Sequence, residues 1–198
     1  MNDLVENRNA RAVYRWRRML RRRMVARRKA ITGNARTKAT ARIESALKEV
    51  FSMTDCRTVA LYWPIRGEVD LRPFARGDLV HRFALGLPYV PVRCQPVLFR
   101  QWHPGAAMEQ GFWNIPVPRD ETCLRPDILL IPLVGFDEKG YRLGNGGGYY
   151  DRTLARMDRS TLKIGIGFEE THLPTIHPQW HDIPMDIVIT EQGARVWS

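Results

Sequence analysis

The longest apolar run in the chain lies in DILLIPLVGF, residues 127–136, in which every position after Asp127 is apolar. A strand with this pattern is buried on both faces, as the inner strands of a parallel sheet are. Shorter runs rich in β-branched and aromatic residues predict further strands. These runs cover residues 58–63, 83–90, 96–102, 162–168 and 185–190, and we expect the last of them to be the final strand.

Apolar residues at helical spacing mark two long segments before the first predicted strand. In residues 8–32, Val13, Trp16, Leu20 and Met24 lie three or four positions apart, which predicts an amphipathic helix with a thin apolar stripe. Residues 33–51 predict a second helix with Thr32 as its N-cap. Because helices and strands then alternate, we expect one α/β domain with a mostly parallel sheet.

Composition limits the class of protein. With 198 residues and 44% hydrophobic content, the chain is long enough for one substantial core. No apolar run reaches the roughly 18 residues of a membrane-spanning helix, so we expect a cytoplasmic protein without a membrane segment. The three cysteines include no CxxC pair, which argues against a disulfide framework and a zinc site.

The positive charge is confined to one end of the chain. Residues 1–38 hold 13 Lys or Arg against two acidic residues, whereas the remainder holds 18 basic and 19 acidic residues. Three interpretations fit this segment: a solvated basic helix, a phosphate-binding helix of an active site, and an arm that binds nucleic acid or a membrane surface. Charge alone favours the solvated helix.

A glycine cluster follows the longest apolar run. Four of the five residues from Gly144 to Gly148 are glycines, and a helix is expected to begin at YYDRTLARM directly afterwards. Consecutive glycines allow backbone N–H groups to converge on an anion at the carboxyl end of a strand. The cluster lacks the GK[ST] of a Walker loop, and a tight turn without a ligand is the alternative. Neighbouring Arg142, Tyr149 and Asp151 favour a phosphate site with a divalent cation.

The stretch PLVGFDEKGYRLGNGGGYYDRTL, residues 132–154, closely resembles the signature of the 5-formyltetrahydrofolate cyclo-ligase family, also called 5,10-methenyltetrahydrofolate synthetases. Four further segments are similar to family segments in the same order: RRMLR at 17–21, GEVDL at 67–71, FWNIPVP at 112–118 and HDIPMDIVIT at 181–190. The resemblance implies a three-layer α/β/α sandwich with a mostly parallel central sheet, which is Rossmann-like and NagB-RpiA-CoA transferase-like.

The same resemblance implies a ligase of one-carbon metabolism. It would use ATP and Mg²⁺ to cyclise 5-formyltetrahydrofolate, with or without a polyglutamate tail, to 5,10-methenyltetrahydrofolate, with release of ADP and phosphate. In the family's scheme the formyl oxygen attacks the γ-phosphoryl group, N10 then closes on the activated carbon, and phosphate leaves. We expect a monomer of one domain, residues 15–198, preceded by a basic extension, residues 1–14. A nucleic-acid-binding protein that uses the Arg-rich helix is the alternative function.

Site residues follow from the resemblance, position by position. ATP would be bound by Arg17, Arg21, Arg142, Leu143, Gly144, Asn145, Gly146, Gly147, Gly148, Tyr149 and Tyr150. The folate substrate would contact Trp63, Glu68, Trp113, Asn145, Gly146, Gly147, Gly148 and Tyr149. Mg²⁺ would be held by Asp151 and Asp182, with Asp186 as the alternative to Asp182.

Two positions depart from the family pattern, and several predicted site residues have simpler interpretations. Arg17 stands where the family commonly has lysine, and Gly147 stands where some members have lysine. Without the resemblance, tryptophans such as Trp63 and Trp113 would be read as core residues. Glu68 would be read as a surface acid, and Asp182 as a helix cap or a solvated charge beside His181.

Overall fold

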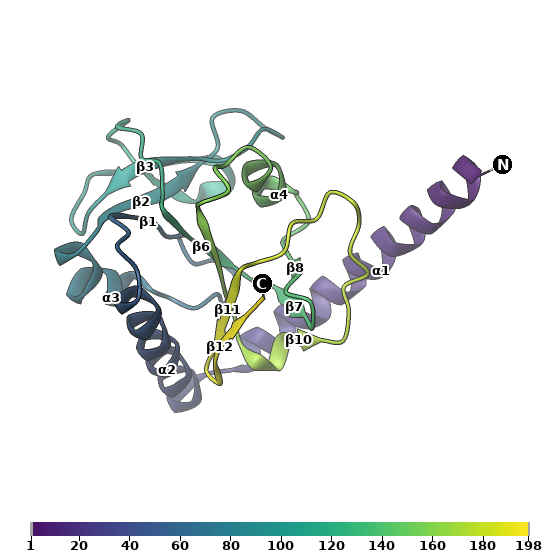
Figure 1. Ribbon diagram of the computed structural model, residues 1–198, viewed down its shortest axis with the longest axis horizontal. Helices are drawn as coiled ribbons and strands as arrows, with labels where there is room; N and C mark the ends of the chain where they lie inside the picture. The colour runs from purple at the N-terminus through teal and green to yellow at the C-terminus, as the bar shows by residue number, and fades with distance from the viewer. Residues whose placement is uncertain (1, 198) are drawn as a thin grey trace.

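The protein is described by a computed structural model that covers the backbone of residues 2–197 and the side chains of residues 10–197. Its centre is a seven-stranded sheet with the order β12-β11-β9-β6-β1-β2-β3 (Figure 1). The strands are β1 (Thr58–Ala60), β2 (Ala84–Tyr89), β3 (Leu98–Trp102), β6 (Ile128–Pro132), β9 (Leu162–Ile166), β11 (Ile187–Thr190) and β12 (Gly193–Val196). The five inner strands run parallel, while β3 and β12 pair antiparallel at the two edges.

Both faces of β6 are buried, as its apolar run predicts. Ile128 and Leu130 pack in the core with α2 (Gly33–Ser52) and α3 (Arg72–Gly77). Leu129 and Ile131 face the opposite core, which includes residues of α4 (Tyr149–Leu154). Side chains alternate along a strand, so β6 separates two hydrophobic cores. The predicted α/β/α sandwich with a mostly parallel sheet is confirmed.

Short elements complete the fold outside the main sheet. A hairpin pairs β4 (Met108–Gln110) with β5 (Pro116–Pro118), and a second small sheet has the order β10 (His172–Leu173), β7 (Gly135–Asp137), β8 (Arg142–Leu143). The 3-10 helices are η1 (Leu79–His81), η2 (Phe112–Asn114) and η3 (Glu169–Thr171).

The prediction that residues 185–190 form the last strand is wrong, because β12 follows β11 after a tight turn of residues 191 and 192. β12 is a half-exposed edge strand that contains Arg195, and it therefore carries little of the apolar signal that marks inner strands.

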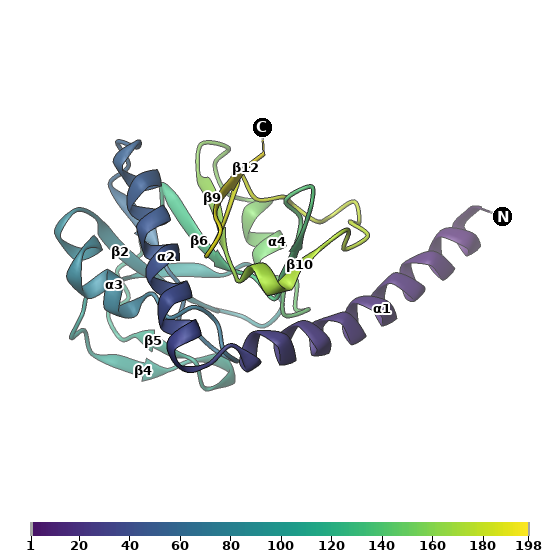
Figure 2. The ribbon, with the colours of Figure 1, turned by 90° about the horizontal axis from the view of Figure 1, so that it is seen from below.

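Helix α1 (Asn2–Ala30) is continuous and longer than the sequence predicts. Its C-terminal half packs on the body of the protein, whereas its N-terminal half extends away from it (Figures 1 and 2). Met24 of the predicted apolar stripe is buried, together with Arg17 and Arg28. The predicted division between residues 1–14 and 15–198 falls inside this helix and stays a prediction, and Met1 and Ser198 lie outside the described residues.

None of the helices within residues 2–197 combines the length and the apolar composition that crossing a membrane requires.

Candidate active site

A cavity of about 640 Å³ lies at the carboxyl ends of three neighbouring parallel strands. The cavity is lined by Tyr62 and Trp63, which follow β1, by Tyr89 at the end of β2 and Val90 directly after it, and by Pro132 at the end of β6. Ligands of open α/β sheets bind at this edge because the loops that follow the strands converge there. Every residue that the sequence predicts to bind ATP, folate or Mg²⁺ lines this same cavity, except the alternative metal ligand Asp186.

The glycine loop, residues 144–148, forms one wall between β8 and α4. Gly146 has φ 96° and Gly148 has φ 64°, which are left-handed conformations that residues with a Cβ rarely adopt. A Cβ on Gly146 would lie 3.3 Å from the guanidinium carbon of Arg21. A Cβ on Gly147 would lie 2.7 Å from the ring of Tyr149. A lysine at position 147, as in some family members, would therefore require the Tyr149 ring to adopt a different position.

Arg21 faces the glycine loop from α1. Its Nε donates a hydrogen bond of 2.8 Å to the carbonyl oxygen of Gly144. Its two terminal nitrogens bond to none of the residues that the structure describes, so they are available to a ligand. Burial and then the neighbouring charge of Arg17 lower the pKa of the Arg21 guanidinium. A half-buried cation beside a side-chain-free loop is suited to a phosphate group.

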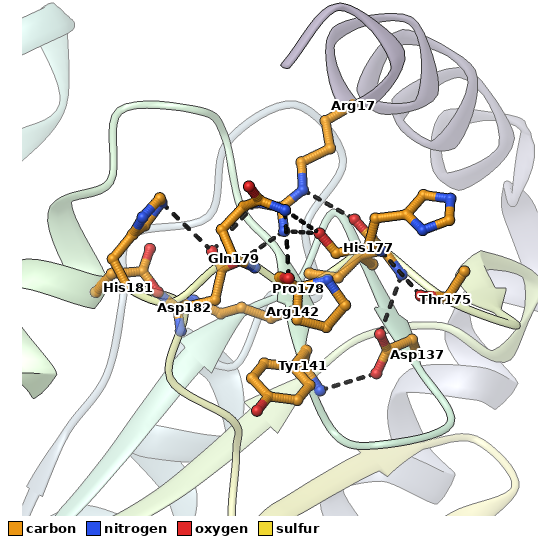
Figure 3. A network of polar contacts seen from close by, with 12 residues as sticks. Arg17, Asp137, Tyr141, Arg142, Thr175, His177, Pro178, Gln179, His181 and Asp182 are labelled. Atoms are coloured by element: carbon orange, nitrogen blue, oxygen red, sulfur yellow. Dashed lines mark hydrogen bonds and ion pairs between the residues drawn. The ribbon is translucent and has the colours of Figure 1, made fainter. Parts of the chain in front are cut away.

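Arg17 lies one turn earlier on α1, but its guanidinium is already bonded to protein atoms. Its Nε donates to the carbonyl oxygen of Ile176 at 2.9 Å, and Nη2 donates to that of His177 at 2.9 Å. Nη1 and Nη2 also pair with the carboxylate of Asp182 (Figure 3). Arg17 therefore fastens α1 to the loop of residues 174–184, and its predicted contact with phosphate stays a prediction.

The two predicted metal ligands are both paired with arginines. Burial acts to raise the pKa of Asp182, but hydrogen bonds from Arg17 and the Gln179 amide outweigh it, so the pKa lies below its ordinary value. Asp151 forms an ion pair of 2.9 Å with Arg142, whose own pKa burial lowers. Asp182 is thus held in its ionised form, and Asp151 lies against a buried cation.

Few carboxylates in the cavity are placed to bind a metal ion. Asp186 does not line the cavity, because it pairs with Lys163 at 2.8 Å and accepts that residue's amide hydrogen. Among the residues that the structure describes, no three His, Cys, Asp or Glu side chains gather into a metal site. Mg²⁺ commonly uses only one or two carboxylates and takes its other ligands from phosphates and water. Asp151 and Asp182 fit a cation that arrives with a nucleotide.

Aromatic side chains line the other end of the cavity. Trp63 is half-buried, and the guanidinium of Arg72 covers its ring at 4.5 Å. Trp113 projects from the β4–β5 hairpin, is 58% exposed and meets the ring of Tyr149 at 5.1 Å, edge to face. Trp113 and Asn114 both have positive φ, so the hairpin tip turns sharply where it presents the indole. These rings offer flat apolar surfaces to a heterocyclic ligand.

Glu68 is the buried acid of this end, with 4% of its surface exposed. Its carboxylate accepts the Ile65 amide hydrogen at 3.0 Å and an amide hydrogen of Asn145 at 3.4 Å. It also lies 3.6 Å from Arg28. Burial raises the pKa of Glu68, and the amide bond from Ile65 and the charge of Arg28 oppose the rise.

Several residues of the site escaped sequence reasoning. Arg28 carries no signal in the sequence, because it is one of many arginines on α1 and its partners lie far along the chain. Ala10, Val13 and Tyr14 also line the cavity, although they belong to the predicted basic extension. Their position at helical spacing before Arg17 is the signal that was available.

Comparisons with known proteins agree on one family. A model described as the 5-formyltetrahydrofolate cyclo-ligase family matches residues 13–191. A 5-formyltetrahydrofolate cyclo-ligase of Escherichia coli K12 is 33% identical over 148 residues, which cover 71% of this chain and 80% of the relative. One from Haemophilus influenzae is 30% identical, with 67% and 75% covered.

Solved structures give the same result. A 5,10-methenyltetrahydrofolate synthetase of Aquifex aeolicus is 31% identical and superposes with a TM-score of 0.80, over 91% of this chain and 92% of the other. A 5,10-methenyltetrahydrofolate synthetase of Mycoplasma pneumoniae is 25% identical with a TM-score of 0.73, over 88% and 98%.

Proposed function

Because this chain belongs to the 5-formyltetrahydrofolate cyclo-ligase family, we propose that it cyclises 5-formyltetrahydrofolate to 5,10-methenyltetrahydrofolate at the expense of ATP. One observation carries the proposal: the glycine loop, the aromatic wall with Glu68, and the Arg21 nitrogens that bond to no described residue all line a single cavity. A phosphate-binding wall and a wall for a flat heterocycle therefore face each other across the space where two substrates react.

The reaction needs activation because a formyl oxygen on nitrogen is a poor leaving group. The formyl oxygen attacks the γ-phosphorus of ATP, and the bond to the ADP oxygen breaks. N10 then forms a bond to the activated formyl carbon and gives up its proton, and the oxygen departs with phosphate. The protein's task is to align the two substrates and to neutralise charge, as in other phosphoryl transfers.

The phosphate end of the cavity is suited to the first step. The loop amides from Gly144 to Gly148 and the terminal nitrogens of Arg21 would bind the phosphates. Asp151 and Asp182 would hold Mg²⁺, which supplies positive charge to the triphosphate. Arg142 orients Asp151 and Arg17 orients Asp182, each through an ion pair.

The aromatic end is suited to the folate. The carboxylate of Glu68 would accept hydrogen bonds from the N–H groups of the pterin ring. Trp63, Trp113 and Tyr149 would pack against the flat rings and exclude water from them. The cytoplasmic location and the monomeric state expected from the sequence belong to the same proposal.

The test follows the absorbance of 5,10-methenyltetrahydrofolate when pure protein is mixed with 5-formyltetrahydrofolate and MgATP. We expect product in proportion to enzyme, with one ADP released for each product molecule. Omission of ATP is the control and should abolish the signal. Well-folded protein that forms no product under these conditions would contradict the proposal.

A further inference from the structure

Glu68 reaches the cavity from a turn of unusual shape. In the Glu68 turn, residues 65–68, Arg66 has φ 50° and Gly67 has φ 79°. Two consecutive left-handed residues reverse the chain so that Glu68 enters the cavity from its wall. Arg66 is not a glycine, and this conformation is disfavoured for it, so the surrounding structure must hold it in place.

Two arginines from different helices hold three consecutive carbonyl groups of this turn. Nη2 of Arg28, on α1, donates to the carbonyl oxygen of Arg66 at 3.1 Å. Nη2 of Arg36, on α2, donates to those of Gly67 at 3.0 Å and Glu68 at 2.6 Å. Arg28 is fixed in turn by a bond of 2.8 Å from Nη1 to the carbonyl oxygen of Leu133, directly after β6. The helices and the central sheet thus jointly set the shape of the turn.

The two arginines differ in one respect, because Arg28 is also paired with the carboxylate of Glu68. The two groups are 3.6 Å apart, and their side chains are 1% and 3% exposed. A buried charge without a partner is strongly disfavoured, so this cation stabilises the ionised form of the acid, together with the hydrogen bond from the Ile65 amide. The other charged or titratable groups around Glu68 are Arg66 and Arg36 near the turn, Tyr62 after β1, Asp70 before α3 and Tyr150 on α4.

We propose that Arg28 is a positioning residue that holds Glu68 ionised and aimed at the folate. Arg36, by contrast, contacts only the backbone carbonyl groups of the same turn. The inference rests on the proposed function, since it gives Glu68 the task of accepting N–H groups of the substrate. An ionised carboxylate accepts at both oxygens, whereas a protonated one loses part of this capacity. Arg28 touches no substrate and acts through Glu68.

The pH dependence separates the two arginines. The variants are Arg28→Gln and, as the matched control, Arg36→Gln, which removes the same kind of backbone contact without removing the partner of the acid. We measure kcat/KM for 5-formyltetrahydrofolate from about pH 5 to pH 9, and folate binding without ATP by quenching of tryptophan fluorescence.

Loss of Arg28 removes a group that lowers the pKa of Glu68, so the acid limb of both profiles should move to higher pH, by about one unit. At neutral pH we expect kcat/KM for folate to fall about tenfold, with the KM for ATP within about twofold of the wild-type value. Arg36→Gln should lower kcat/KM less and leave the acid limb in place. Equal acid limbs in the two variants would overturn the inference.

A second comparison tests whether Arg28 acts through Glu68, even if Arg28→Gln alone does not fold. The double variant Arg28→Gln, Glu68→Gln contains no unpaired buried charge, and it is compared with Glu68→Gln. Without the carboxylate, Arg28 can act only through its bonds to the turn, so the double variant should lose no more kcat/KM relative to Glu68→Gln than Arg36→Gln loses relative to the wild type. The acid limb that belongs to Glu68 should be absent from both. A further large loss in the double variant would show that Arg28 acts elsewhere. Wild-type protein that forms no product would instead contradict the proposed function itself.

Discussion

The carboxylates at the two ends of the cavity lie in different environments. At the phosphate end, Asp182 and Asp151 each face an arginine at hydrogen-bond distance, and the pKa of Asp182 lies below its ordinary value. At the aromatic end, Glu68 is buried, Arg28 lies 3.6 Å from its carboxylate, and the pKa of Glu68 is raised. The phosphate end therefore holds its carboxylates in short ion pairs, whereas the aromatic end keeps a desolvated acceptor whose charge depends on its neighbours.

The largest effect is expected from closing the phosphate end. Gly146→Val places a branched side chain at φ 96° and against Arg21, so the loop must deform and its amides leave their positions. We expect kcat/KM for ATP to fall by about 100-fold or more, while binding of folate in the absence of ATP changes little.

Steady-state kinetics and fluorescence titration measure the two quantities. An unchanged KM for ATP would show that the loop does not bind phosphate. Gly193→Ala, at the first residue of β12 and outside the cavity lining, is the control for strain at a positive φ.

The next largest effect is expected on ATP binding, and it should distinguish Arg21 from Arg17. Arg21→Lys removes terminal nitrogens that no described residue occupies, so we expect the KM for ATP to rise about tenfold with little change in thermal stability. Arg17→Lys keeps a cation beside Asp182 but loses bonds to the loop carbonyls, so the melting temperature should fall and the KM for ATP should change less than about threefold.

Thermal melts and kinetics on both variants provide the measurement. The reverse pattern, with ATP binding dependent on Arg17 alone, would transfer the phosphate contact to that residue. Arg18→Lys, on the exposed side of the same helix, is the matched control.

A still smaller effect, on the KM for folate, is expected when the pH is lowered. The raised pKa of Glu68 means that this acid takes up a proton at higher pH than Asp182, whose pKa is lowered. As the pH falls from about 7.5 towards 5, the KM for folate should therefore rise by several-fold before the KM for ATP changes. Initial rates at varied concentrations of each substrate test this order, and a KM for ATP that rises first would contradict it.

The smallest effect is expected at the exposed face of α1. Arg11, Arg15, Arg18 and Arg22 follow one another at helical spacing and are exposed. If this face is only solvated, replacing all four with glutamine should leave kcat/KM within about twofold.

The same variant tests the nucleic-acid alternative. Binding of a generic RNA by the wild-type protein, weakening with salt by about 0.7 log units per log unit of salt for each phosphate contacted and lost in the variant, would favour that alternative. Glutamine at Arg119, Arg125, Arg156 and Arg159, which are also exposed, makes the same change of net charge elsewhere and is the control.

The sequence determined what local patterns can encode. The run at residues 127–136 gave the doubly buried strand β6, because apolar residues on successive positions are stable only between two cores. The helix α1 and the glycine loop could also be predicted, because the spacing of apolar residues and the absence of a Cβ are properties of the local sequence. The family signature then named the residues that line one cavity.

Tertiary structure alone decided which charges meet. Arg17 pairs with Asp182 across 165 positions of sequence, and Arg28 bonds to Leu133 across 105. Nothing in their local sequence distinguishes these arginines from the others on α1, because an ion pair depends on where the folded chain brings two groups and how little water remains between them. The sequence therefore supplied the site's residues, and the packing of α1 against the ends of the strands determined which of them are free to bind a ligand.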